Sequence, residues 1–241
     1  MANIEGRNPI IEALRSDRPI DKLMISNTSK EGSIKKIIGM AKDKNIVVQY
    51  VDRNKLDEIS TSHSHQGVIA VVSDYKYYEL EDLFEIARER GEDPFLIILD
   101  EITDPHNLGT IIRTADSAGV DAIILLKGCV DIYNPKVIRS TMGSIFDMNI
   151  IQTTQDEAVD FLKANNFDIV SSYLHTESYY NETTYDGKIA LVIGNEANGI
   201  NDELISKSDK LVKIPIYGNA ESLNAAISAA ILMYEIKKYL V

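Results

Sequence analysis

Three segments of the chain place amide, hydroxyl or charged side chains beside glycine, each directly after an apolar run. They read DPHNLGTIIRTA (104–115), LVIGNEANGI (191–200) and IPIYGNAESLNAAISAAI (214–231). Amides and hydroxyls both donate and accept hydrogen bonds, and arginine binds phosphate through two parallel bonds. Such groups suit the orientation of a polar or anionic substrate and the transfer of its proton. The candidate residues are Asn107, Arg113, Glu196, Ser222 and Asn224.

The first segment predicts a turn followed by a helix. Pro105 turns the chain, and Asn107 is placed to cap the helix that follows. The apolar residues form a buried face, so Arg113 is expected to project elsewhere. Taken alone, this segment is also explained by a helix cap and a surface arginine.

The second segment, taken alone, is also explained by a common turn, whereas the third contains more polar groups than capping requires. In the second, Gly194 follows a strand and allows close approach of the backbone to a ligand, and Glu196 could orient a partner group or hold a cation. Pro215 and Gly218 indicate a tight loop before the last helix, where Ser222 can cap the free amides. One capping residue would be enough, so the added Asn224 suggests a site.

Several common kinds of site are absent from the sequence. There is no G-x-G-x-x-G after a strand and no G-x-x-x-x-G-K-[ST], so a nucleotide-dependent α/β enzyme is disfavoured. A G-x-S-x-G nucleophile elbow is also missing, which argues against a Ser-His-Asp hydrolase. His63 and His65 have no cysteine nearby, and no metal site is expected.

The polar segments depend on an α/β framework. Apolar runs predict strands at 22–26, 46–51, 67–73, 95–100, 121–126, 167–174 and 188–194. Helices are predicted near 8–16, 32–44, 53–60, 107–119, 134–146, 156–166 and 222–240. Alternating buried strands and helices predict a mostly parallel sheet covered on both faces, with ligands at the carboxyl ends of its strands.

Composition and charge divide the chain. The segments predicted are a small α/β domain at 1–73, a charged, tyrosine-rich linker at 74–93 and a larger α/β domain at 94–241. The net charge is −12, with +2 in residues 1–73 and −14 in the remainder. A bound polyanion would therefore depend on the N-terminal part and on a local patch, although the acidity could equally serve solubility alone.

The cysteine count and hydropathy point to a cytoplasmic protein. Cys129 is the single cysteine, so no internal disulfide can form and a reducing compartment fits. The N-terminus has no apolar signal region, and no apolar run is long enough to span a bilayer. We therefore expect no membrane association.

The three polar segments, in this order and spacing, resemble the three motifs of the SpoU/TrmH family of RNA ribose 2′-O-methyltransferases. The third segment is the most specific of them. GRNPIIEAL near the start and HQGVIA at 65–70 also resemble the substrate-binding domain of the family's bacterial 23S rRNA guanosine 2′-O-methyltransferases. The resemblance covers nearly the whole chain.

This resemblance implies a fold with a deep trefoil knot and S-adenosylmethionine as cofactor. The positions that match the family's cofactor site are Gly194, Ile214 and Leu223. Arg113 matches the residue usually given the task of removing the ribose proton. This role is chemically awkward because free arginine has a pKa above about 12. Arg113 could equally bind the phosphate of the target nucleotide.

The resemblance also implies a homodimer whose active site is completed near the interface. The expected reaction is S-adenosylmethionine-dependent methylation of RNA at a ribose 2′-hydroxyl, with a guanosine of 23S rRNA as the first choice of substrate. A tRNA ribose methyltransferase is the nearest alternative. A non-catalytic RNA-binding ribosome-assembly factor is another, and the complete set of polar residues argues against it.

Overall fold

The computed structural model describes residues 2–16, 19–29, 32–61, 63–72, 77–84 and 93–240. The chain forms two compact units, one from Met1–Lys76 and Asp131–Asp147 and the other from Tyr77–Val130 and Met148–Val241. Of the predicted linker, residues 74–76 and 85–92 lie outside the described residues.

The first unit is built on a mixed four-stranded sheet with the order β1-β4-β2-β3. Its strands are β1 (Ala2–Glu5), β2 (Ile20–Ser26), β3 (Val47–Val51) and β4 (Val68–Val72). Its helices are α1 (Arg7–Arg15), α2 (Ser33–Asp43), α3 (Arg53–Ile59), α6 (Pro135–Thr141) and the 3-10 turn η2 (Ser144–Phe146).

The two N-terminal motifs meet in this unit. The Arg7 main-chain N–H donates to Gln66 Oε1 at 3.1 Å, and Arg7 Nε donates to the Gln66 carbonyl oxygen at 3.1 Å. The His65 ring is buried, bonds Asp57 Oδ1 through Nε2 at 2.8 Å and accepts the Gly67 N–H at 3.0 Å. These contacts give GRNP and HQG a structural role in holding the start of α1.

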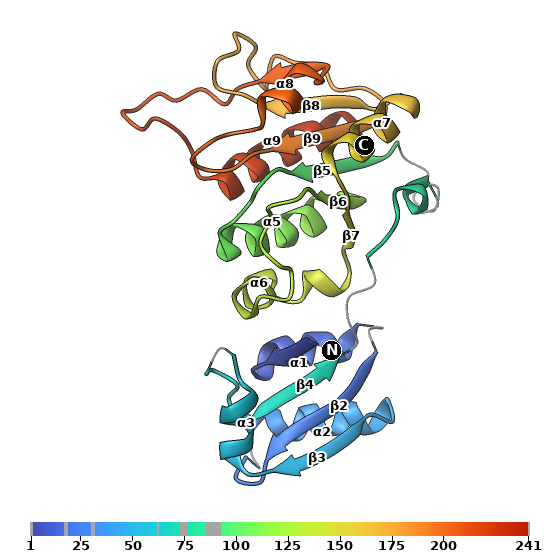
Figure 1. The fold of residues 1–241 in the computed structure, drawn as a ribbon, viewed down its shortest axis with the longest axis vertical. Coiled ribbons are helices and arrows are strands. Elements are labelled where there is room, and N and C mark those ends of the chain that lie inside the picture. The colour runs from blue at the N-terminus through green and yellow to red at the C-terminus, as the bar shows by residue number, and fades with distance from the viewer. Residues whose placement is uncertain are drawn as a thin grey trace. The chain divides into compact units, whose positions relative to one another are not determined.

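The second unit contains a six-stranded sheet with the order β10-β8-β9-β5-β6-β7, in which all neighbouring strands are parallel (Figure 1). Its strands are β5 (Phe95–Leu99), β6 (Ala122–Leu125), β7 (Asn149–Gln152), β8 (Asp168–Ser172), β9 (Ile189–Ile193) and β10 (Lys210–Val212). Its helices are η1 (Leu80–Asp82), α5 (Pro105–Ala118), α7 (Gln155–Ala164), α8 (Asp202–Ser206) and α9 (Ala225–Leu240).

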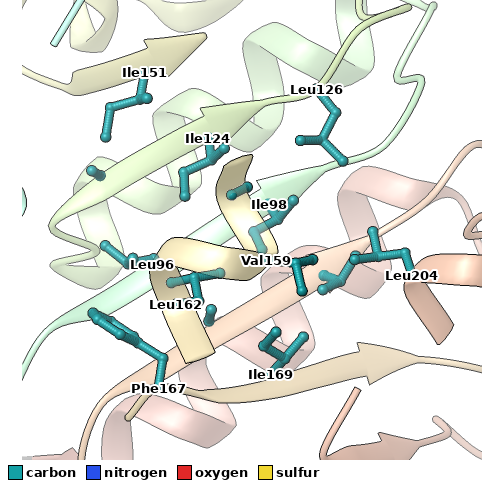
Figure 2. Close-up of a cluster of buried hydrophobic side chains, with 14 of the residues drawn as sticks. Leu96, Ile98, Ile124, Leu126, Ile151, Val159, Leu162, Phe167, Ile169 and Leu204 are labelled. Carbon is teal, nitrogen blue, oxygen red and sulfur yellow. The ribbon is translucent and has the colours of Figure 1, made fainter. Parts of the chain in front are cut away.

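Both faces of this sheet are covered, because β5, β6 and β9 are buried at every position. Alternate residues such as Leu96 and Ile98 join Val159 and Leu162 of α7 and Leu204 of α8 in one hydrophobic cluster (Figure 2). In the second layer of helices, α9 packs against α5 and against the strand β9. The predicted α/β class and parallel sheet are confirmed.

Some element predictions were wrong. The strands β1, β7 and β10 were not predicted, and each has only three or four residues. The predicted helix at 134–146 is two elements, because Met142 and Gly143 adopt left-handed φ angles of 52° and 109°. None of the helices in the described ranges is long and apolar enough to cross a membrane.

Candidate active site

The strand order reverses between β5 and β9. From β5 the chain continues to β6 and β7 on one side, whereas β8, β9 and β10 lie on the other. Leu99 and Ile193 end these two strands in register, so the loops that follow them start side by side (Figure 1). Ligands of open parallel sheets bind at such a reversal of strand order.

Three of the predicted residues meet at this point through a directed pair of hydrogen bonds. Asn224 Nδ2 donates to Asn107 Oδ1 at 2.9 Å, and Asn107 Nδ2 donates to Glu196 Oε1. The three residues come from the three polar segments of the sequence. The carboxylate therefore fixes the orientation of one amide, and that amide fixes the next.

The start of α5 leaves Asn107 available for these contacts. Asp104, not Asn107, caps the helix, because its Oδ1 accepts the N–H groups of His106 and Asn107, both at 2.9 Å. The prediction of Asn107 as the cap was wrong. Proline is favoured in the first helical position, so Pro105 was the signal that the cap lies at 104.

The last helix begins three residues later than predicted. Asn224 Oδ1 accepts the N–H groups of Ala226 at 2.9 Å and Ile227 at 3.2 Å, so Asn224 performs the capping expected of Ser222. One amide side chain thus caps α9 with its oxygen and orients Asn107 with its nitrogen.

Two predicted residues are not joined to this cluster. Arg113 is exposed on α5, and within the described part of the chain its guanidinium forms no hydrogen bond or ion pair. Ser222 is exposed and likewise lacks a hydrogen-bond partner among the described residues. Both side chains face solvent and can still meet a ligand.

Close packing within its own loop requires glycine at position 194. A Cβ atom at this position would lie 2.3 Å from the carbonyl carbon and oxygen of Gly199. The main chains of Asn195 and Gly199 exchange two hydrogen bonds of 2.9 Å, which close the loop onto Gly194. By contrast, a Cβ at Gly218 would meet no protein atom within 4 Å.

The segment 214–223 differs from this closed loop in its main-chain hydrogen bonding. Its main chain forms no hydrogen bond with any other described residue. Ile214 and Leu223 are half-buried at its two ends, and both side chains are apolar. Free backbone donors and acceptors beside apolar side chains fit a flat heterocycle such as adenine. The predicted cofactor residues are therefore compatible with that use.

Among the described residues, no group of three or more His, Cys, Asp or Glu side chains could hold a metal ion. His63 lies in the first unit with a left-handed φ of 50°, and His65 is held by the contacts given above.

Two residues that were not predicted join the loops of the site. Asn195 Nδ2 donates to the Glu101 carbonyl oxygen at 2.8 Å, and the buried Asp100 accepts the Asn201 N–H at 2.8 Å. The sequence shows Asn195 between Gly194 and Glu196, but its partner lies 94 positions away, so nothing local reveals the contact.

Two family models match the chain. The model of the SpoU rRNA Methylase family matches residues 94–234. The model described as RNA 2'-O ribose methyltransferase substrate binding matches residues 3–78.

Curated relatives match over nearly their whole length. The chain is 37% identical to the putative TrmH family tRNA/rRNA methyltransferase YacO of Bacillus subtilis, over 96% of this chain and 93% of that protein. It is 35% identical to a putative TrmH family tRNA/rRNA methyltransferase of Staphylococcus aureus, over 97% of this chain and 94% of that protein.

Solved structures share the fold. One is an rRNA methyltransferase from Sinorhizobium meliloti with bound AdoMet, with a TM-score of 0.83, 28% identity and coverage of 100% of this chain and 88% of that one. Another is the SpoU methyltransferase AviRb from Streptomyces viridochromogenes in complex with AdoMet, with a TM-score of 0.81, 25% identity and coverage of 98% and 89%.

Proposed function

Because the chain belongs to the SpoU/TrmH family of S-adenosylmethionine-dependent RNA methyltransferases, we propose that it methylates a ribose 2′-hydroxyl in RNA. The observation that carries this proposal is the Asn224–Asn107–Glu196 hydrogen-bonded cluster beside the segment 214–223, whose main chain bonds no other described residue. The polar cluster can orient a hydroxyl group, and the segment 214–223 can bind a cofactor.

The cofactor would be held by Gly194, Ile214 and Leu223. Ile214 and Leu223 would pack on the adenine, while the unpaired main chain between them would bond its polar edge. When bound, S-adenosylmethionine supplies a methyl group already activated by its sulfonium, so the protein mainly has to orient the attacking hydroxyl. Calorimetry with the purified protein and a chelator should show binding; folded protein with no heat of binding would contradict the assignment.

The polar cluster would position the ribose. Glu196 fixes the Asn107 amide, and Asn224 fixes it from the other side. Ser222 lies two residues before Asn224 and would contribute its hydroxyl to the same nucleotide. Correct placement of a nucleophile lowers the barrier because the entropy of orientation has already been lost on binding.

Arg113 would complete the site either by taking the ribose proton or by binding the target phosphate. The variant Arg113→Lys separates these roles, because lysine keeps the charge but lacks the planar fork of donors. If Arg113 is the base, the single-turnover rate at saturating RNA should fall by roughly 10²–10⁴-fold. If it binds phosphate alone, RNA affinity should fall and that rate should remain close to wild type.

The substrate we propose is a guanosine of 23S rRNA. Support comes from the match of residues 3–78 to a substrate-binding domain and from the positive charge of the N-terminal part within an acidic chain. Mapping of 2′-O-methyl groups in rRNA and tRNA from a deletion strain would test this substrate. We expect the protein to act in the cytoplasm. Wild-type protein, but not Glu196→Gln, should restore the missing group; its appearance in tRNA instead would contradict the rRNA assignment.

We further propose that the protein works as a knotted homodimer. Ile227 and Tyr234 of α9 are 51% and 53% exposed, which is unusual for large apolar side chains on a helix that packs on the sheet. The exposed guanidinium of Arg113 would then meet a site completed by the second copy. Analytical ultracentrifugation should give a dimer for the wild type and weaker association for Tyr234→Asp.

A further inference from the structure

The side chain of Asn195 bonds main-chain atoms through both ends of its amide. Nδ2 donates to the Glu101 carbonyl oxygen at 2.8 Å. Oδ1 accepts the N–H groups of Ala197 at 2.8 Å and Asn198 at 3.2 Å. The oxygen thus stabilises the turn of its own loop, whereas the nitrogen reaches the loop after β5.

The partner of Asn195 has a constrained backbone. Glu101 has a φ of 53°, a left-handed conformation that is unfavourable for a residue with a Cβ atom. Such a conformation persists when surrounding contacts hold it. The same two loops are joined a second time, where the buried Asp100 accepts the Asn201 N–H.

Each residue of the Asn195–Glu101 contact lies shortly before a member of the polar cluster in the sequence. Glu196 follows Asn195, and Glu101 precedes the Asp104 cap that starts α5 and carries Asn107. The relative placement of the Glu196 carboxylate and the Asn107 amide therefore depends on how the two loops are held.

We propose that Asn195 is a positioning residue that sets the alignment of Asn107 with Glu196 through its hydrogen bond to Glu101. Both ends of its amide bond main-chain groups, so the role we assign to it acts through these main-chain partners. This role rests on the proposed methyl transfer, which uses Asn107 and Glu196.

The chemistry of the amide makes the role testable. In Asn195→Asp, the oxygen can still accept from Ala197 and Asn198, but the second carboxylate oxygen would face the Glu101 carbonyl and cannot donate to it. In Asn195→Ala both kinds of contact are lost. The matched control is Asn198→Ala in the same loop, because the Asn198 side chain is exposed and has no hydrogen bond among the described residues.

The experiment measures the single-turnover rate of the full-length protein at saturating RNA and S-adenosylmethionine, together with cofactor affinity and Tm. We expect Asn195→Asp and Asn195→Ala to lose about 10- to 100-fold in rate, since misplacement by 1 Å can cost about that much. Cofactor affinity should stay within about threefold, and Asn198→Ala should match wild type. An Asn195→Asp rate equal to wild type would overturn the proposal, because the turn contacts alone would then be sufficient.

A second readout does not depend on activity. The side-chain amide NMR signals of Asn107 in the cofactor-free protein should shift in Asn195→Asp and stay unchanged in Asn198→Ala. Unshifted Asn107 signals in Asn195→Asp would overturn the positioning role even in a protein that methylates no RNA. Conversely, shifted signals in a protein without methyl transfer would contradict the proposed function and leave the positioning role supported. If Asn195→Ala fails to fold, Asn195→Asp still decides the question.

Discussion

The loop after β9 and the segment after β10 both contribute to the candidate site, but they are built in opposite ways. In residues 194–199 the main chain pairs with itself and the Asn195 side chain bonds three main-chain groups. In residues 214–223 the main chain bonds no other described residue. The closed loop suits a carboxylate that must be held still, and the open segment suits recognition by backbone groups.

The largest expected difference between the two regions comes from adding one methyl group to each. Gly194→Ala places a Cβ 2.3 Å from the Gly199 main chain and must open the closed loop, whereas the same change at Gly218 meets no atom within 4 Å. We expect Gly194→Ala to lose about 1–3 kcal/mol of unfolding free energy and most methyl transfer, and Gly218→Ala to stay within about 0.5 kcal/mol. Urea unfolding and turnover would check both. Equal stability of the two variants would remove the distinction.

A second change separates the two uses of Asn224. In Asn224→Asp the oxygen still caps α9, but donation to Asn107 is lost, whereas Asn224→Ala loses both. We expect Asn224→Ala to cost about 0.5–2 kcal/mol of stability and Asn224→Asp to keep wild-type stability. Both should lower the single-turnover rate by about tenfold, the loss of roughly one hydrogen bond. Full activity in a stable Asp variant would show that the Asn224–Asn107 contact is not needed.

Hydrogen exchange measures the contrast without a mutation. Amides within 214–223 should exchange rapidly in the free protein and slow by about tenfold at a cofactor concentration near ten times Kd. The amides of Asn195 and Gly199 are already bonded, so their exchange should change less. Protection of 214–223 before cofactor is added would contradict the open description.

The smallest effect concerns a third loop beside β5. The Cys129 thiol donates to the Leu99 carbonyl at 3.3 Å, and burial raises its pKa from 9.0 to about 11. The thiol should therefore react slowly with iodoacetamide at pH 8 in the folded protein and quickly in urea. Because the folded state holds its proton to higher pH, this thiol's contribution to stability is complete below pH 9 and is lost as pH rises towards 11. Rapid alkylation of the folded protein at pH 8 would contradict the burial.

Much of this site could be predicted from sequence because its signals are local. The runs around Phe95 and Ile189 identify buried parallel strands, and the polar residues that follow mark their carboxyl ends. Both helix caps were predicted at the wrong residue. Asp104 caps α5 instead of Asn107, and Asn224 caps α9 instead of Ser222, because neighbouring polar residues can all cap a helix. The choice between them depends on contacts made elsewhere in the fold.

What could not be predicted depends on which strands become neighbours. The bond from Asn195 to Glu101 exists because β9 inserts beside β5, which local periodicity does not reveal. The strand β10 was missed because three residues give too short a pattern. The lack of main-chain hydrogen bonds from 214–223 to other described residues is a property of the assembled unit and has no signature of its own in the amino acids.

The hydrogen bond between Asn107 and Asn224 has a consequence for biosynthesis. It joins residues separated by 117 positions, and its donor, Asn224, directly precedes α9. Contacts of such long sequence separation form late, and domains fold as the chain emerges from the N-terminus. A chain shortened before α9 would lack the Ala226 and Ile227 N–H groups that Asn224 caps, so the Asn224 side chain would not be held toward Asn107. Under the proposed function, methyl transfer would therefore require α9 to be in place, and chains shortened before this helix should be inactive.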